Sequence, residues 1–147
     1  MSLANWSRNG WLVRHRTSAA EIADLLAVVE RDLGDSAAGR LSADWRLSIA
    51  YNAALQAATA ALAAAGYRAA RDQHHYRVIQ SLRFTVGLGK KLVDRFDAFR
   101  KKRNLGAYER AGMASDGEAR EMRVLATDLR KAVLAWLKSQ HPKFGAK

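Results

Sequence analysis

The sequence of 147 residues has no cysteine, a single proline and no long apolar run. Without cysteine, a disulfide framework, a catalytic thiolate and a thiolate zinc site are excluded. No stretch approaches the roughly 18–20 apolar residues of a membrane-spanning helix. Near the N-terminus, Arg8, Arg14 and Arg16 interrupt the few apolar residues, so no signal peptide is expected there. We therefore expect a cytoplasmic protein that does not interact with a membrane.

Alanine, in contrast to proline, is abundant, with 29 residues among the 147. Apolar residues make up 49% and charged residues 27% of the chain, close to the average of globular proteins, which excludes wholesale disorder. Because alanine has the highest helix propensity and proline the lowest, this composition favours helices. A chain of this length is expected to form one domain.

The formal net charge of +11 is unevenly distributed along the chain. Residues 1–73 carry 8 Lys and Arg against 7 Asp and Glu, whereas residues 74–147 carry 17 against 7. A one-sided positive charge favours a phosphate-rich partner, of which nucleic acid is the commonest. The compositional alternative is a high-GC genome, which favours arginine and alanine and yields basic proteins with no nucleic-acid role.

Helix signals divide most of the chain into amphipathic segments. Ser18 and Glu21 have the spacing of a capping box, and Ser115 and Glu118 repeat it. No segment alternates apolar and polar residues in a β-branched context, so no strand is predicted. The expected helices cover about 18–34, 42–66, 72–87 with Asp72 as its cap, 88–106 and 115–141.

Short connections between helices of this length favour antiparallel neighbours. The predicted fold is therefore all-α, an up-and-down bundle of four or five helices over residues 17–142. Residues 1–16 form an N-terminal arm, which is either packed on the bundle or loose, and residues 143–147 form a C-terminal tail.

The fourth predicted helix carries an arginine where its apolar stripe requires a hydrophobic residue. One line along this helix holds Leu92, Phe96, Phe99 and Arg103. A buried guanidinium is costly unless it is paired or lines a polar groove. Either the helix ends near Gly106 and leaves Arg103 in water beside the last carbonyls, or Arg103 faces such a groove.

The residues that begin at this arginine, Arg103-Asn104-Leu105-Gly106-Ala107-Tyr108, resemble the signature of the HEPN superfamily. That signature is an arginine followed by a polar residue and, four to six positions after the arginine, by a histidine. The flanking segments 96–100 and 108–112 are also similar to those of HEPN proteins, and residues 50–67 resemble their long early helix. The similarity spans roughly residues 18 to 141.

The resemblance implies an HEPN-like bundle, commonly a homodimer in which two copies of the motif face each other across a groove. Many HEPN proteins are metal-independent endoribonucleases that act on single-stranded RNA as toxins or in defence, often paired with a nucleotidyltransferase-type antitoxin. RNA supplies its own 2′-hydroxyl nucleophile, so neither a cofactor nor a metal is implied. In this sequence Arg103 would contact the scissile phosphate, and Asn104 and Tyr108 occupy the other two motif positions.

Tyr108 stands where the family has its histidine. A phenol with a pKa of about 10 is a poor general base at neutral pH, although it can donate a hydrogen bond to a phosphate. Either Tyr108 substitutes for the histidine, aided by a histidine elsewhere, or the domain binds its ligand without turnover.

Basic residues surround the motif, with Arg100, Lys101 and Lys102 before Arg103 and Arg110 after it. Such a run is usually a solvated helix face, but beside Arg103 it also makes a surface that can follow a phosphate backbone. These four residues are the predicted nucleic-acid-binding set.

The histidine pair His74–His75 does not predict a metal site. His75 lies in line with Ile79 and Leu82, as a core or interface histidine does. Adjacent histidines point to different faces of a helix, and no third ligand follows at three or four residues.

The second predicted helix carries a polar stripe, which consists of Asn52, Gln56 and Thr59 and aligns with Trp45 and Ile49. This stripe faces either a partner subunit or solvent.

The sequence thus predicts an RNA-acting protein, with a metal-independent endoribonuclease of the toxin or defence type as the leading hypothesis. The alternative is a non-catalytic HEPN-like module that binds nucleic acid, nucleotide or a protein partner. The expected partners are single-stranded RNA or other nucleic acid, a second copy of the chain and a nucleotidyltransferase-type antitoxin.

Overall fold

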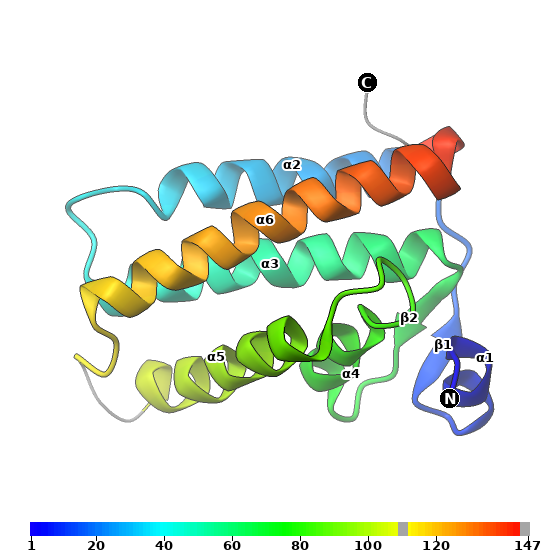
Figure 1. Ribbon diagram of the computed structural model, residues 1–147, viewed down its shortest axis with the longest axis horizontal. Helices are drawn as coiled ribbons and strands as arrows, with labels where there is room; N and C mark the ends of the chain where they lie inside the picture. Colours follow the sequence, from blue (N-terminus) through cyan, green and yellow to red (C-terminus); the bar gives the residue numbers. More distant parts are fainter. Residues whose placement is uncertain (109–111, 145–147) are drawn as a thin grey trace.

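The computed structural model describes residues 1–108 and 112–144, with the backbone alone for residues 104–108. The described chain is mostly helical, which confirms the predicted class at that level (Figure 1). Its elements are α1 (Leu3–Arg8), β1 (Leu12–Arg14), α2 (Ala19–Asp35), α3 (Ala43–Ala64), β2 (Tyr67–Ala69), α4 (His74–Ser81), α5 (Lys90–Tyr108), α6 (Asp116–Gln140) and a short 3₁₀ turn, Pro142–Phe144.

Helix α3 is the centre of the molecule, with α2 and α6 on one side and α4 and α5 on the other (Figure 1). Most of its buried residues are alanines, whose small side chains let the neighbouring helices approach closely. Contrary to the expectation that no stretch approaches the length of a spanning helix, α3 is the one helix within the described residues that is long and apolar enough to cross a membrane, and 72% of that apolar window is buried inside the bundle. Its composition therefore fits a core helix.

Serine caps begin three of the long helices as predicted. The hydroxyls of Ser18, Ser42 and Ser115 accept hydrogen bonds from the backbone N–H three residues later, at 3.1, 3.2 and 3.0 Å. The box at Ser115 is complete, because the Glu118 carboxylate accepts the Ser115 N–H at 3.0 Å. The side chain of Glu21 does not close the first box; it accepts from Thr17 Oγ1 at 2.7 Å instead.

Two short strands contradict the prediction that the chain has none. β1 and β2 pair antiparallel, with Leu12 opposite Ala69. Each strand has only three residues, too few to show an alternating pattern, and the pairing joins segments far apart in the sequence. The ladder attaches the N-terminal arm to the end of α3.

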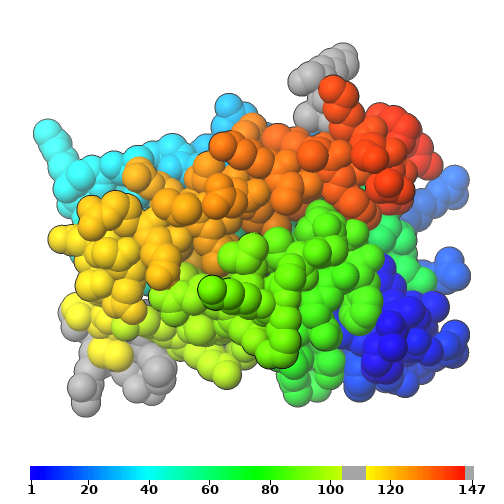
Figure 2. All heavy atoms as spheres, in the orientation of Figure 1, coloured from blue at the N-terminus to red at the C-terminus, as the bar shows by residue number. Residues whose placement is uncertain are grey.

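The N-terminal arm is packed on the bundle. Trp6 is buried and meets Trp11 and Phe84 edge-on, with ring centroids 5.9 and 5.2 Å away. The Arg77 guanidinium of α4 lies over the Trp11 ring, 3.8 Å from its centroid, which is the geometry of a cation–π contact. Figure 2 shows the arm (blue) against the green segment that contains α4. The arm therefore holds α4 in place.

Helix α4 starts and ends differently from the prediction. Its N-cap is Gln73 rather than Asp72, and Gln73 has a left-handed backbone with φ of 52° and no side-chain cap. That conformation is uncommon for a residue other than glycine. The helix ends at Ser81, whereas the apolar pattern predicted a helix as far as residue 87, and residues 82–89 form turns and loop.

On α5, the predicted apolar stripe is wrong at one position. Leu92 is 50% exposed, and its neighbour Val93 takes the buried place beside Phe96 and Phe99. Arg103 stays on this buried face, where it is half-buried. α5 ends at Tyr108, close to the predicted end near Gly106, but Arg103 is half-buried, which contradicts the alternative that leaves it in water.

Candidate functional site

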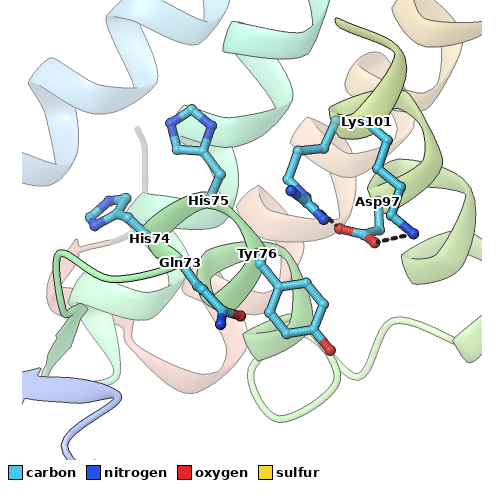
Figure 3. Close-up of a pocket in the computed structure, with 7 residues that line it drawn as sticks. Gln73, His74, His75, Tyr76, Asp97 and Lys101 are labelled. Atoms are coloured by element: carbon cyan, nitrogen blue, oxygen red, sulfur yellow. Dashed lines mark hydrogen bonds and ion pairs between the residues drawn. The ribbon is translucent and has the colours of Figure 1, made fainter. Parts of the chain in front are cut away.

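A cleft of about 470 Å³ lies between α4 and α5. Figure 3 shows His75 and Tyr76 leaving α4 in different directions, with the Asp97–Lys101 pair of α5 across from them. The lining residues share a polar or titratable side chain and are Gln73, His74, His75, Tyr76, Asp97, Arg100 and Lys101. A phosphate group and a proton-transfer group can therefore meet in this cleft.

Tyr51 of α3 joins the histidine of α4 to the arginine of α5. Its hydroxyl lies 3.2 Å from His75 Nδ1. The Arg103 guanidinium lies over the ring of the same tyrosine, 5.4 Å from its centroid. A tyrosine hydroxyl both donates and accepts, so it keeps the contact with His75 whether or not Nδ1 carries a proton. Three helices thus bring Arg103 and His75 together through one side chain.

The charge state of His75 suits a proton acceptor. Partial burial lowers the pKa of His75, and the positive charges of Arg103 and Arg100 lower it further. The imidazole is therefore neutral at neutral pH. Burial raises the pKa of Tyr51 well above its ordinary value, so the hydroxyl keeps its proton over the same range.

Asp97 holds the cations of the cleft in place. It is almost completely buried and accepts a hydrogen bond from Arg100 Nε at 2.7 Å. Lys101 Nζ lies 3.8 Å from its other carboxylate oxygen. The Asp97 bond raises the pKa of Arg100, and the Arg100 guanidinium lies 5.6 Å from the centroid of the Tyr76 ring. One carboxylate therefore orients two cations and neutralises only part of their charge.

Arg103 differs from Arg100 because its guanidinium is incompletely bonded. Its Nε is buried and has no hydrogen-bond partner among the described residues. Buried polar atoms without a partner are rare in proteins and point to a missing ligand, water or ion. Arg103 is not among the residues that line the cleft, but it lies behind His75 on the Tyr51 ring and is the arginine of this region whose Nε lacks a partner within the described residues.

Of the predicted nucleic-acid-binding residues, Arg100 and Lys101 lie in the cleft and Lys102 does not. Lys102 Nζ is 2.8 Å from a carboxylate oxygen of Glu118 on α6, which directs this lysine away from α4. The predicted residue Arg110 and the side chains of Asn104 and Tyr108 lie outside what the structure describes.

The sequence interpretation missed the site roles of Tyr51 and Asp97. Tyr51 falls within the predicted helix 42–66, among alanines, where a buried hydroxyl needs a partner, and this was the available signal. Asp97 and Arg100 have the i,i+3 spacing of a helical ion pair, which was the available signal. His75 was interpreted as a core or interface histidine, and it is half-buried and bonded but also lines the cleft.

Within residues 1–108 and 112–144, no group of three or more His, Asp or Glu side chains is arranged to hold a metal ion. No protein-family model matches the chain, and no match was found among curated proteins or solved structures.

Proposed function

We propose that the protein binds single-stranded RNA at the α4–α5 cleft and cleaves it as an HEPN-like endoribonuclease that needs no metal. The observation that carries this proposal is the arrangement of Arg103 and His75 around Tyr51, which places an incompletely bonded cation near a neutral imidazole. Phosphodiester cleavage by the RNA 2′-hydroxyl requires these two kinds of group.

His75 is the proton acceptor in the proposed reaction. It takes the proton of the 2′-hydroxyl, O2′ attacks the phosphorus, and the bond from phosphorus to O5′ breaks. The leaving O5′ takes a proton from water, and His75 returns its proton to the solvent, so the products are a 2′,3′-cyclic phosphate and a 5′-hydroxyl. Arg103 opposes the negative charge that develops on the phosphate oxygens. With His75 in this role, Tyr108 in the family's histidine position does not prevent catalysis.

Arg100 and Lys101 supply the binding surface for neighbouring phosphates. Both line the cleft, and together they carry two positive charges against the single carboxylate of Asp97. The Tyr76 ring in the same cleft offers a face on which a base can stack, and base stacking on aromatic side chains tolerates any sequence. The cleft therefore fits a single strand better than a duplex.

We also propose that the protein acts as a cytoplasmic homodimer, with a nucleotidyltransferase-type antitoxin as a further partner of the toxin or defence role. Within the predicted polar stripe of α3, Trp45 is 64% exposed, whereas Asn52 donates a hydrogen bond to Asp32 of α2 at 2.7 Å and so faces its own chain. Trp45 is therefore the part of the stripe that a second copy can cover. Light scattering at micromolar concentration that reports only a monomer would contradict the homodimer.

The second candidate function is RNA binding without turnover. It is favoured by the ion pairs of Asp97, which already occupy Arg100 and Lys101, and by the tyrosine at position 108. In that case the cleft retains an RNA strand, and His75 only supports Tyr51.

Purified protein incubated with single-stranded RNA in EDTA tests the proposal. The wild type should cleave the RNA, and Arg103→Ala should reduce the rate by on the order of a hundredfold or more, because a cation aimed at developing charge is lost. Arg16→Ala is the matched control, since Arg16 is exposed and belongs to the N-terminal arm. Intact RNA in the wild-type sample, with retained binding, would establish the second candidate instead.

A further inference from the structure

A second basic hollow is lined by residues 36–39, which follow the end of α2, and by residues of α3 and of the start of α6; Figure 1 shows these segments at the same end of the bundle. Its volume is about 170 Å³. Three arginines line it, Arg46 from α3 and Arg120 and Arg123 from α6. It shares no lining residue with the α4–α5 cleft. We call it the arginine pocket.

The three arginines of the arginine pocket are not equivalent. Arg46 is already engaged, since its Nη2 pairs with the Asp116 carboxylate and its Nε donates to the Leu41 carbonyl at 3.1 Å. Arg120 and Arg123 make no ion pair and no side-chain hydrogen bond within the described residues. None of the residues that line the pocket is acidic. Two positive charges therefore face one small hollow without a counter-charge.

The other residues that line the arginine pocket are small, namely Ser36, Ala37, Gly39 and Ala119. Since liquid water occupies about 30 Å³ per molecule, a volume of about 170 Å³ holds roughly five water molecules or one phosphoryl group. The pocket is too small for a larger organic group.

A second hollow of about 420 Å³ borders the arginine pocket, since Arg123 lines both. Its wall combines Leu33 of α2 with Val124 of α6, which is 54% exposed. Asp128 adds a carboxylate acceptor at its edge. An anion in the first hollow can thus be attached to an organic group that lies on apolar residues in the second.

We propose that the arginine pocket binds the phosphate of a small phosphate monoester. A phosphate monoester carries about −1.5 to −2 charges at neutral pH, which matches the two uncompensated arginines, whereas a backbone phosphodiester carries one. Guanidinium groups bind phosphate oxygens in a bidentate geometry, so two arginines satisfy one phosphoryl group. The organic part of the ligand lies against Leu33 and Val124.

Titration calorimetry at low salt tests this site with AMP, inorganic phosphate and adenosine as probes. AMP and inorganic phosphate should bind to the wild type and adenosine should not. Arg120→Ala and Arg123→Ala should each weaken AMP binding by about tenfold or more, because each removes charge-assisted hydrogen bonds. Alanine is the best helix former, so α6 should persist in both variants, which circular dichroism checks.

The variant Arg103→Ala distinguishes AMP binding in the arginine pocket from AMP binding in the RNA cleft. AMP affinity should be unchanged in Arg103→Ala and in the exposed control Arg16→Ala. AMP binding that disappears in Arg103→Ala but persists in Arg120→Ala and Arg123→Ala would place the phosphate in the cleft and overturn the proposal. The absence of AMP and phosphate binding to the wild type would overturn it as well, and neither outcome bears on RNA cleavage.

RNA oligonucleotides distinguish the source of the phosphate. A 5′-phosphorylated oligonucleotide that competes with AMP, next to a 5′-hydroxyl oligonucleotide that does not, would identify an RNA end as the ligand. If neither oligonucleotide competes with AMP, the ligand of the arginine pocket is a free nucleotide. Equal competition by both oligonucleotides would overturn the proposal, because the pocket would then bind backbone phosphodiesters.

Discussion

Helix α3 contacts its neighbours through two surfaces of opposite character. On the side away from Tyr51, α3 presents alanines, such as Ala53, Ala57 and Ala60, which are completely buried. Towards α4 and α5 it presents Tyr51, whose contacts are a hydrogen bond and a cation–π interaction. Close packing stabilises the first surface, whereas the second depends on polar groups that a ligand can engage. Substitutions should therefore change stability on one surface and RNA cleavage on the other.

The largest effect is expected for His75→Gln. Glutamine can keep a hydrogen bond to the Tyr51 hydroxyl but cannot accept a proton, so cleavage in EDTA should fall by about 10²–10⁴-fold. The melting temperature and the affinity for RNA should change little, because the side chain is only half-buried. Wild-type cleavage rates in His75→Gln would remove His75 from the mechanism.

Overpacking the alanine surface should lower the stability of the fold and leave RNA binding unchanged. Ala57→Leu inserts a large side chain where α3 is completely buried, which should lower the free energy of unfolding by about 1–3 kcal/mol in urea denaturation. Affinity for RNA, measured on the folded variant, should stay at the wild-type value. The control is Ala135→Leu on α6, where the exposed position should tolerate leucine. Equal destabilisation by both would mean that α3 is not tightly packed.

Tyr51→Phe tests the side chain that links His75 to Arg103. The ring that Arg103 covers remains, but the hydroxyl bonded to His75 is lost. We expect a loss of about 0.5–1.5 kcal/mol in the free energy of unfolding, which is the usual net contribution of one hydrogen bond. A parallel fall in the cleavage rate would show that Tyr51 positions His75, and an unchanged rate would show that it does not.

A smaller effect is expected for Lys101→Ala, in the salt dependence of RNA binding. Each phosphate contact with a single strand contributes about 0.7 to the slope of log K against log salt, so the slope should fall by that amount. Lys91→Ala is the matched control, because Lys91 is exposed on the first turn of α5. The same reduction of the slope in both variants would mean that a lysine in the cleft contributes no more to RNA binding than an exposed lysine elsewhere.

The smallest effect is expected in the pH dependence of stability. Burial holds the pKa of His75 below its ordinary value of about 6.5, so the unfolded chain binds a proton there before the folded chain does. The free energy of unfolding should therefore decrease as the pH falls below about 6.5, until the pH passes the lowered pKa of His75 in the folded state. In His75→Gln this part of the decrease should be absent. If the free energy of unfolding, measured by urea denaturation, depends on pH in the same way in the wild type and in His75→Gln, this prediction is wrong.

Local signals allowed most of the helices to be predicted from the sequence. The serine caps at Ser18, Ser42 and Ser115 act within one helical turn, so neighbouring residues alone determine them. The left-handed cap at Gln73 has no such signal, because side chains other than glycine rarely adopt that conformation. The β1–β2 pair was missed for a different reason, since distant segments must meet before either strand forms.

The candidate site could be predicted only in part. Arg103 stood out because a charged residue interrupts an apolar stripe, which is visible along one helix. The contact of Tyr51 with His75 joins residues 24 positions apart on two helices, so it depends on how the helices pack. The same limit applies to Lys102, whose partner Glu118 lies on α6 and could not be identified from a run of basic residues.

Analysis of the cleavage products tests the proposed function most directly. A single-stranded RNA and its 2′-O-methyl counterpart of identical sequence would be incubated with the wild type in EDTA, and the ends would be identified by mass spectrometry. We predict 2′,3′-cyclic phosphate and 5′-hydroxyl ends from the RNA, and no cleavage of the methylated strand, whose 2′-oxygen cannot attack. Cleavage of both strands, or of neither, would contradict attack by the 2′-hydroxyl at the Arg103–Tyr51–His75 site.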